Sequence, residues 1–317
     1  MNKILSIKNL SISFRVFNQT YKVLDDVSFS IDRGECIAIV GESGSGKSTL
    51  GKALLGLNPL ATTIIEDGGI YYQGTNLLKL DQSSLRAYRG KEISMIFQDP
   101  LTSLNPTMRV GNQVLESFLK HHPQITKEVA KRKVIELFNW IGIHNPEERF
   151  YHYPHQFSGG MRQRVVIAIA LAPNPKILIA DEPTSALDPT IQIQILDLLK
   201  KIQTDLKMSI ILITHDLSIV SRFTSRTIVM YAGTILEDGP SETLLQEPSH
   251  PYTQKLLKSI PRLGLNKRDR LIPIIGSPPS ILHPISGCPF HPRCDQALDI
   301  CKKERPNMNT KNSACWL

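Results

Sequence analysis

A short apolar run followed at once by a glycine-rich loop is the feature that most constrains the fold of this chain. Residues 36–40 read CIAIV, which is typical of a buried parallel strand, and residues 41–50 read GESGSGKSTL, where a helix is expected to begin. Strand, loop and helix form the context in which the pattern G-x-x-x-x-G-K-[ST] binds phosphate, because the loop's backbone N–H groups point at the anion. The predicted phosphate-binding residues are Gly41, Glu42, Ser43, Gly44, Ser45, Gly46, Lys47, Ser48 and Thr49.

Two further apolar runs are predicted strands that end in polar residues. Residues 177–183 read ILIADEP, and residues 209–216 read SIILITHD. Because ligands bind at the carboxyl ends of parallel strands, Asp181, Glu182 and His215 are expected at the same edge as the glycine-rich loop. Glu182 is the expected general base that polarises the attacking water, and His215 is expected to contact the γ-phosphate.

The same residues predict a magnesium site beside the phosphates. Lys47 is expected to reach the β- and γ-phosphates, and the Ser48 hydroxyl is expected to hold Mg²⁺. Asp181 would hold the ion directly or through a water molecule. The sequence therefore predicts a nucleotide-hydrolysing site that uses Mg²⁺.

Size and composition are those of a globular chain. With 317 residues and 41% hydrophobic residues, it can form one large domain and a smaller one. There is no run of about eighteen apolar residues, so no membrane-spanning segment is expected. The N-terminal MNKILSIKNLSISF alternates apolar and polar residues, which predicts a strand and not a signal peptide. A cytoplasmic protein, in which disulfides are rare, is expected.

Positive charge is concentrated near the C-terminus. The formal net charge is +8, and residues 251–317 contribute +7 of it. The excess indicates either a solvated basic tail or an anionic partner, which could be a membrane surface, a nucleic acid or a negatively charged cofactor.

Residues 155–172 read HQFSGGMRQRVVIAIALA, in which Ser-Gly-Gly opens a long apolar helix. At this point the sequence resembles the ATP-binding subunits of ABC transporters, over about residues 4–260. The resemblance rests on six motifs in the family's order, namely GESGSGKST, the glutamine of IFQDP (Gln98), FSGGMRQR, ILIADEP, SALD (185–188) and THD (214–216). It implies an α/β fold, a P-loop ABC ATPase with a mixed or parallel sheet core, an inserted helical subdomain and a cysteine-containing C-terminal extension. ATP and Mg²⁺ are the implied cofactors.

The resemblance also implies a dimer in which two such subunits close head to tail around two ATP molecules. Ser158, Gly159 and Gly160 would then contact the ATP held by the partner subunit, and Asp188 would cross the interface. Gln98 would sense Mg²⁺ and the attacking water, help to hold the ion, and couple the site to the transporter.

The match departs from the family pattern at the signature motif, which usually reads LSGGQ. Phe157 and Met161 replace its outer residues, while the central Ser-Gly-Gly is intact. The family also stacks an aromatic residue on adenine near the N-terminus, and Phe14, Phe17 and Tyr21 are equal candidates for that position.

Domain boundaries follow from the same resemblance. Residues 1–250 are the expected ATPase domain, and a helical subdomain is expected at about 99–165, where two stretches carry apolar residues at helical spacing. Residues 251–317 resemble the C-terminal region of ATP-binding subunits that drive uptake of dipeptides, oligopeptides or nickel.

Peptide import is the expected function, and import of nickel or another metal complex is the alternative, because the cargo does not touch this subunit. The expected partners are a second ATPase subunit, two transmembrane permease subunits and an extracellular or periplasmic solute-binding protein, at the cytoplasmic face of a bacterial cell membrane. The second ATPase is expected to be a paralogous chain, and a second copy of this chain is the alternative. A soluble ABC ATPase acting on DNA or ribosomes is the rival class. Such proteins usually carry two ATPase domains or a long coiled coil, so no nucleic-acid partner is expected.

Four of the five cysteines lie in the last thirty residues, with the spacing C-x5-C-x6-C-x13-C. This spacing differs from the C-x2–4-C pairs of zinc sites, and the C-x2-C runs usual for iron–sulfur proteins are absent too. The subfamily resemblance favours a [4Fe-4S] cluster on Cys288, Cys294, Cys301 and Cys315, with zinc and unliganded thiols as alternatives. Arg293, Lys302, Lys303 and Arg305 would then balance the charge of the cluster. Cys36 is expected to be a small buried residue.

Overall fold

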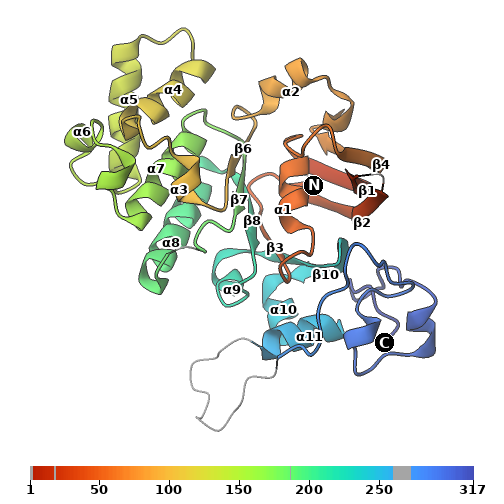
Figure 1. Cartoon of the computed structure of the whole chain (residues 1–317). Helices are drawn as coiled ribbons and strands as arrows, with labels where there is room; N and C mark the ends of the chain where they lie inside the picture. The colour runs from red at the N-terminus through yellow and green to blue at the C-terminus, as the bar shows by residue number, and fades with distance from the viewer. Residues whose placement is uncertain (1–2, 18, 186, 260–272) are drawn as a thin grey trace. The chain divides into compact units, whose positions relative to one another are not determined.

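The computed structural model describes residues 3–17, 19–185, 187–259 and 273–317. The chain divides into two compact units. Unit 1 comprises Met1–Asp32, Cys36–Lys79 and Ile213–Leu317, and unit 2 comprises Arg33–Glu35 and Leu80–Leu212. The chain passes from unit 2 into unit 1 within strand β8 (Ser209–Thr214), in which every residue is buried. Figure 1 shows the elements of both units in chain order.

Unit 1 contains an antiparallel sheet with the strand order β2-β1-β4-β5. Its strands are β1 (Lys3–Val16), β2 (Gln19–Asp32), β4 (Thr63–Tyr72) and β5 (Thr75–Asn76). The predicted N-terminal strand is confirmed as β1, in which Ile7 is opposite Phe29 of β2 and Ile70 of β4. Burial does not simply follow the alternation of the sequence, since residues 10–13 of this strand are all buried.

A second group of strands in unit 1 positions the glycine-rich loop. Strand β3 (Cys36–Val40) is parallel to β9 (Arg226–Tyr231), which pairs antiparallel with β10 (Thr234–Pro240). All five residues of β3 are buried, including Cys36, as the continuous apolar run predicts for a strand covered on both faces. The glycine-rich loop follows β3 and leads into helix α1 (Lys47–Ala53). The predicted order of strand, loop and helix is confirmed.

The chain after residue 240 forms short helices and irregular segments that pack against these strands. The helices after residue 240 are α10 (Ser241–Gln246), α11 (Pro251–Lys258), η3 (His291–Arg293) and η4 (Asp299–Lys302). Two short helices of unit 1 lie earlier in the chain, η1 (Leu77–Lys79) and α9 (Val220–Phe223). One hydrophobic cluster joins Val40 of β3 to Tyr252 of α11 and to Phe290 near the C-terminus. The C-terminal region therefore shares a core with the strand that precedes the glycine-rich loop. A domain boundary at residue 250 stays a prediction.

Unit 2 contains most of the helices and a parallel strand pair. Strands β6 (Ile93–Ile96) and β7 (Ile177–Asp181) are parallel, with Ile93 opposite Ile177. The helices are α2 (Gln82–Tyr88), α3 (Pro100–Ser103), α4 (Val110–His121), α5 (Lys127–Trp140), α6 (Pro146–Arg149), η2 (Pro154–Gln156), α7 (Gly159–Leu171) and α8 (Pro189–Leu206). The chain combines helices with parallel strand pairs (β3 with β9, β6 with β7) and antiparallel pairs (β9 with β10), which confirms the predicted α/β class.

Helices α4 and α5 confirm the two helices expected from apolar periodicity, and both pack against α7. The Ser117 hydroxyl of α4 also donates a hydrogen bond to the Ile169 carbonyl of α7 at 3.0 Å. The extent of a helical subdomain at about 99–165 stays a prediction. Across the part of the chain that the structure describes, no helix has the length and apolar character needed to cross a membrane.

Candidate nucleotide site

The glycine-rich loop in unit 1 has the close backbone packing that its glycines permit. A Cβ atom on Gly41 would lie 2.1 Å from the Met230 carbonyl oxygen of β9, so no larger residue fits there. Gly46 has a φ of +96°, in the left-handed region that favours glycine, and a Cβ there would lie 2.8 Å from Leu24 Cδ2. The loop thus packs closely against β9 at its first residue, Gly41, and against β2 near its end, at Gly46.

Lys47 is folded back into this loop. Its Nζ donates hydrogen bonds to the carbonyl oxygens of Gly41 and Glu42 at 2.7 and 2.8 Å, and to the Ser45 hydroxyl at 3.2 Å. The residue is 5% exposed, so its ammonium group is nearly dry. A buried cation with carbonyl partners gives the loop a positive centre that can bind an anion of several charges.

The second residue of the loop, Glu42, is held by residues from the C-terminal region. Its backbone N–H donates to the Tyr252 hydroxyl at 3.0 Å. Its carboxylate accepts two hydrogen bonds from Arg293, Nη1 to Oε2 at 2.6 Å and Nη2 to Oε1 at 3.1 Å. Sequence reasoning missed both contacts because no local pattern links positions 42, 252 and 293.

The basic residues near the cysteines have carboxylate partners that the sequence did not predict. Arg293 pairs with Glu42, and Arg305 Nη1 lies 2.5 Å from Asp25 Oδ2 of β2. Lys302 pairs with its neighbour Asp299 at 3.2 Å. Three of the four cations therefore have carboxylate partners in the protein, and their positions are explained without a cluster charge.

In unit 2, the structure brings together two of the predicted site residues. Glu182 follows directly after β7, and Gln98 follows β6, so the parallel pairing of these strands places both at one edge. Gln98 Nε2 donates a hydrogen bond to Glu182 Oε2 at 3.0 Å. Glu182 has a φ of +47°, which is uncommon for a residue with a side chain and is typical of functional sites. Asp181, the last residue of β7, is 2% exposed.

The Ser-Gly-Gly motif opens helix α7 as the sequence predicts. The Ser158 hydroxyl accepts a hydrogen bond from the Met161 N–H at 3.4 Å and caps the helix. A Cβ on Gly160 would lie 2.6 Å from Ile191 Cγ2 of α8, so this glycine allows the two helices to approach closely. Asp188, the residue before α8, is exposed.

His215 directly follows β8 in unit 1 and is exposed. Its loop is shaped by Asp216, whose carboxylate oxygen Oδ1 accepts a hydrogen bond from the Ser218 N–H at 2.8 Å. The predicted residues thus divide between the units. His215 belongs to unit 1 with the glycine-rich loop, and Gln98, Ser158, Asp181 and Glu182 belong to unit 2.

The four C-terminal cysteines line one small pocket in unit 1. Burial raises the pKa of Cys288 to about 11 and also raises the pKa of Cys294. Among the described residues, no group of three or more His, Cys, Asp or Glu side chains has an arrangement that could hold a metal ion. Neither the iron–sulfur cluster nor a zinc ion is therefore supported by the described residues.

Comparison with known proteins identifies the families that this sequence matches. The family described as ABC transporter matches residues 24–185, and the family described as oligopeptide/dipeptide transporter, C-terminal region, matches residues 236–301. The dipeptide transport ATP-binding protein DppD of Bacillus subtilis (strain 168) is 46% identical over 321 residues, covering 100% of this chain and 95% of the relative. The oligopeptide transport ATP-binding protein OppD of the same organism is 47% identical, covering 97% of this chain and 86% of the relative.

Solved structures agree with the sequence relatives. The ATP-binding cassette MJ0796, in a dimeric post-hydrolysis state bound to ADP and Pi, superposes with a TM-score of 0.66 at 29% identity, covering 75% of this chain and 98% of the cassette. The protein cbiO1 of Clostridium perfringens, part of the ABC transporter complex cbiONQ, gives a TM-score of 0.65 at 29% identity, covering 78% of this chain and 92% of cbiO1. With the glycine-rich loop, the Ser-Gly-Gly helix and the Gln98–Glu182 pair in place, the chain belongs to the ABC transporter family of ATP-binding proteins.

Proposed function

We propose that this chain is the ATP-hydrolysing subunit that energises import of dipeptides or oligopeptides through separate membrane subunits. The observation that carries the proposal is the likeness to DppD and OppD, which extends over the full chain. It includes residues 236–301, the part that matches the C-terminal region of oligopeptide and dipeptide transporters. Nickel as cargo is not favoured by these relatives.

The phosphates of ATP bind at the glycine-rich loop. Lys47 exchanges loop carbonyl oxygens for β- and γ-phosphate oxygens, which bear more negative charge and form stronger hydrogen bonds. Residues 41–46, 48 and 49 bind the phosphates together with Lys47, as the sequence predicts. Ser48, Gln98 and Asp181 offer hydroxyl, amide and carboxylate oxygens, a donor set that suits Mg²⁺, and the ion when bound neutralises charge on the phosphates.

Hydrolysis depends on residues of unit 2. Glu182 accepts a proton from the attacking water, and the hydrogen bond from Gln98 orients its carboxylate for that step. His215 contacts the γ-phosphate. Ser158, Gly159 and Gly160 contact ATP held by a second ATPase subunit, and Asp188 lies at the same interface.

The remaining partners follow from the role of an importer subunit. The second ATPase is a paralogous chain, two permease subunits cross the membrane, and an extracellular or periplasmic binding protein delivers the peptide. The subunit is peripheral and works at the cytoplasmic face of the cell membrane. No nucleic acid is involved.

The decisive experiment measures ATPase activity of the complete reconstituted complex. Its binding protein is loaded with dipeptides, with oligopeptides, or with nickel. Stimulation by peptides is the expected result, and stimulation by nickel alone would overturn the cargo. A complex with Lys47→Ala should lose ATP affinity and peptide-stimulated activity, and unchanged ATP binding would contradict the assigned phosphate site.

An iron–sulfur cluster is not part of this proposal, because the described residues give it no support. Iron and sulfide assays on protein purified without oxygen test the sequence-based prediction directly. If the wild-type protein contains stoichiometric iron and sulfide, and the Cys294→Ser variant does not, the prediction of an iron–sulfur cluster would be supported.

A further inference from the structure

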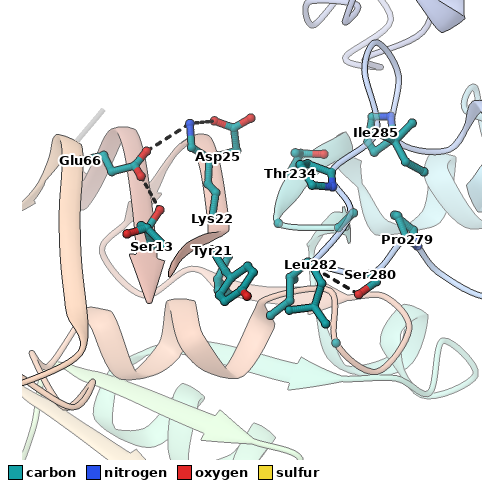
Figure 2. A pocket seen from close by; sticks show the side chains of 18 of the residues that line it. Ser13, Tyr21, Lys22, Asp25, Glu66, Thr234, Pro279, Ser280, Leu282 and Ile285 are labelled. Carbon is teal, nitrogen blue, oxygen red and sulfur yellow. Dashed lines mark hydrogen bonds and ion pairs between the residues drawn. The ribbon is translucent and has the colours of Figure 1, made fainter. Parts of the chain in front are cut away.

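A pocket of about 760 Å³ adjoins the glycine-rich loop within unit 1. Gly44 of the loop lines it, together with Tyr21–Val23 of β2 and the turn Ala232–Thr234. Residues 279–289 and Arg305 of the C-terminal region form another part of the wall, and Ser13 and Glu66 also line it. Figure 2 shows side chains of β2 on one side of the pocket and Pro279, Leu282 and Ile285 on the other. A ligand whose phosphates bind the loop can therefore extend into a space that the C-terminal region helps to enclose.

The charges that line this pocket cancel. Lys22 Nζ lies 3.1 Å from Asp25 Oδ1 and 3.2 Å from Glu66 Oε2. Arg305 of the C-terminal region pairs with the same Asp25. Two cations and two carboxylates are the charged residues among the described lining residues, and they are paired with one another. A neutral nucleoside suits such a pocket better than phosphates do, because it does not require an unpaired charge.

Apolar side chains face this space from opposite walls. Tyr21 presents an aromatic ring on the β2 side of the pocket, and Leu282 lies on the other wall (Figure 2). Leu282 is a large apolar residue that lines the pocket and is 54% exposed, so its side chain is accessible to a ligand. A heterocyclic base has two flat faces that pack on aromatic and apolar side chains. Of the three aromatic candidates near the N-terminus, Tyr21 is the one that lines this pocket, and Phe17 is 97% exposed.

The C-terminal wall is fixed to the rest of unit 1. Arg305 Nη2 donates a second hydrogen bond, to the Asp25 carbonyl oxygen, at 3.1 Å. Gly287, which also lines the pocket, packs so closely that a Cβ would lie 2.2 Å from the Cys301 carbonyl oxygen. The neighbouring Cys288 N–H donates to that same oxygen at 2.8 Å. The segment that carries Leu282 is therefore anchored by contacts at its C-terminal side.

We propose that the C-terminal region forms part of the ATP site of its own chain, with the adenosine moiety lying between Tyr21 and Leu282. The proposal rests on the proposed function for the presence of ATP at the glycine-rich loop, and adds the wall that binds the nucleoside. The C-terminal region then contributes directly to nucleotide affinity, in addition to its packing against the core.

The test compares two ligands that share phosphates and differ in the nucleoside, MgATP and magnesium tripolyphosphate. Their affinities for the purified full chain are obtained from thermal stabilisation over a concentration series. Tyr21→Ala should weaken ATP binding roughly five- to a hundredfold, and Leu282→Asn about three- to tenfold. Both variants should bind tripolyphosphate as the wild type does. Leu298→Asn is the matched control, because Leu298 is 43% exposed in the same region and does not line the pocket.

Each other outcome has a defined meaning. Unchanged ATP affinity in Leu282→Asn, with or without an effect of Tyr21→Ala, would overturn the C-terminal wall. Equal losses for both ligands would also overturn it, since the phosphates alone would then be affected. A wild-type chain that binds neither ligand would instead overturn the proposed function.

A second measurement needs no variant. Photolabelling of the full chain with 8-azido-ATP, followed by peptide mapping, should label a peptide that contains Leu282, and excess ATP should abolish the label. Labelling confined to peptides from outside residues 273–317 would overturn the proposal.

Discussion

Arg293 and Glu42, which are 251 positions apart in the chain, form an ion pair with N–O distances of 2.6 and 3.1 Å. The Arg293 side chain is 6% exposed, and its Nη1 also donates to the Tyr231 hydroxyl at 3.1 Å. A paired guanidinium from the C-terminal region thus holds the second residue of the phosphate-binding loop. The loop's conformation depends on a residue far outside its motif.

Replacing Arg293 should therefore affect both stability and ATP affinity. Arg293→Met leaves the Glu42 carboxylate, 23% exposed, without its cation, and should lower the free energy of unfolding by about 3 kcal/mol. ATP affinity should fall severalfold because the loop loses this support. Denaturant unfolding and MgATP titration of the full chain measure the two effects.

A matched control for Arg293 is Lys302→Met, which removes the Lys302–Asp299 pair. Its side chains are 61% and 94% exposed, so the change should stay within about 0.5 kcal/mol. In a double-mutant cycle, Glu42→Gln with Arg293→Met should cost less than the sum of the single changes. Additive effects would mean that the pair does not support the loop.

Glu182→Gln should retain ATP binding and lose turnover. The neutral amide cannot accept the proton of the attacking water, so kcat should fall at least about a hundredfold. Peptide-stimulated ATPase activity of the complete complex and MgATP binding by the full chain are the two readouts. Glu147→Gln, on α6, serves as the control and should leave both unchanged. Turnover at the wild-type rate would remove Glu182 from the role of general base.

Substitutions at Gly160 can distinguish a role in packing α7 against α8 from a role in binding ATP of a partner subunit. Gly160→Ala puts a Cβ 2.6 Å from Ile191 Cγ2, and should destabilise the chain by about 1–3 kcal/mol. Adding Ile191→Ala makes room for the new methyl group and should restore part of the stability. If the motif also contacts ATP of a partner subunit, ATPase activity of the complex should stay low in the double variant. Full recovery of activity would assign Gly160 to helix packing alone.

Phe290 tests whether the C-terminal region is separable. Its side chain is 0% exposed, and its ring packs edge-on against Tyr231 and Tyr252, with ring centroids 5.4 and 5.2 Å apart. Phe290→Ala should cost about 3–5 kcal/mol, because it leaves a cavity in a core shared with β3. Calorimetry should show the main unfolding transition of the chain at a lower temperature. Loss of only a small separate transition would mean that the C-terminal region folds on its own.

The sequence by itself determined the local elements and the family. Strand, loop and helix around Lys47 follow from a continuous apolar run, closely spaced glycines and helical periodicity, all of which act over a few residues. The N-terminal strand, helices α4 and α5, and the start of α7 at the Ser-Gly-Gly motif were predictable for the same reason. The Gln98–Glu182 contact could be expected only through the family, because the two residues follow different strands that lie far apart in the sequence.

The tertiary structure decided which distant residues meet. Hydrogen bonds from Arg293 to Glu42 and from Arg305 to Asp25 carry no periodic signal. Their position beside the cysteines in sequence had instead suggested that both cations balance the charge of a cluster. Tyr21 could not be distinguished from Phe14 or Phe17 by composition, because all three are aromatic and close in sequence. Folding places Tyr21 in a pocket with the C-terminal region, whereas Phe14, opposite Tyr21 on the neighbouring strand β1, does not line that pocket. The reason is that tertiary packing, and not the local pattern, determines what each face of a strand meets.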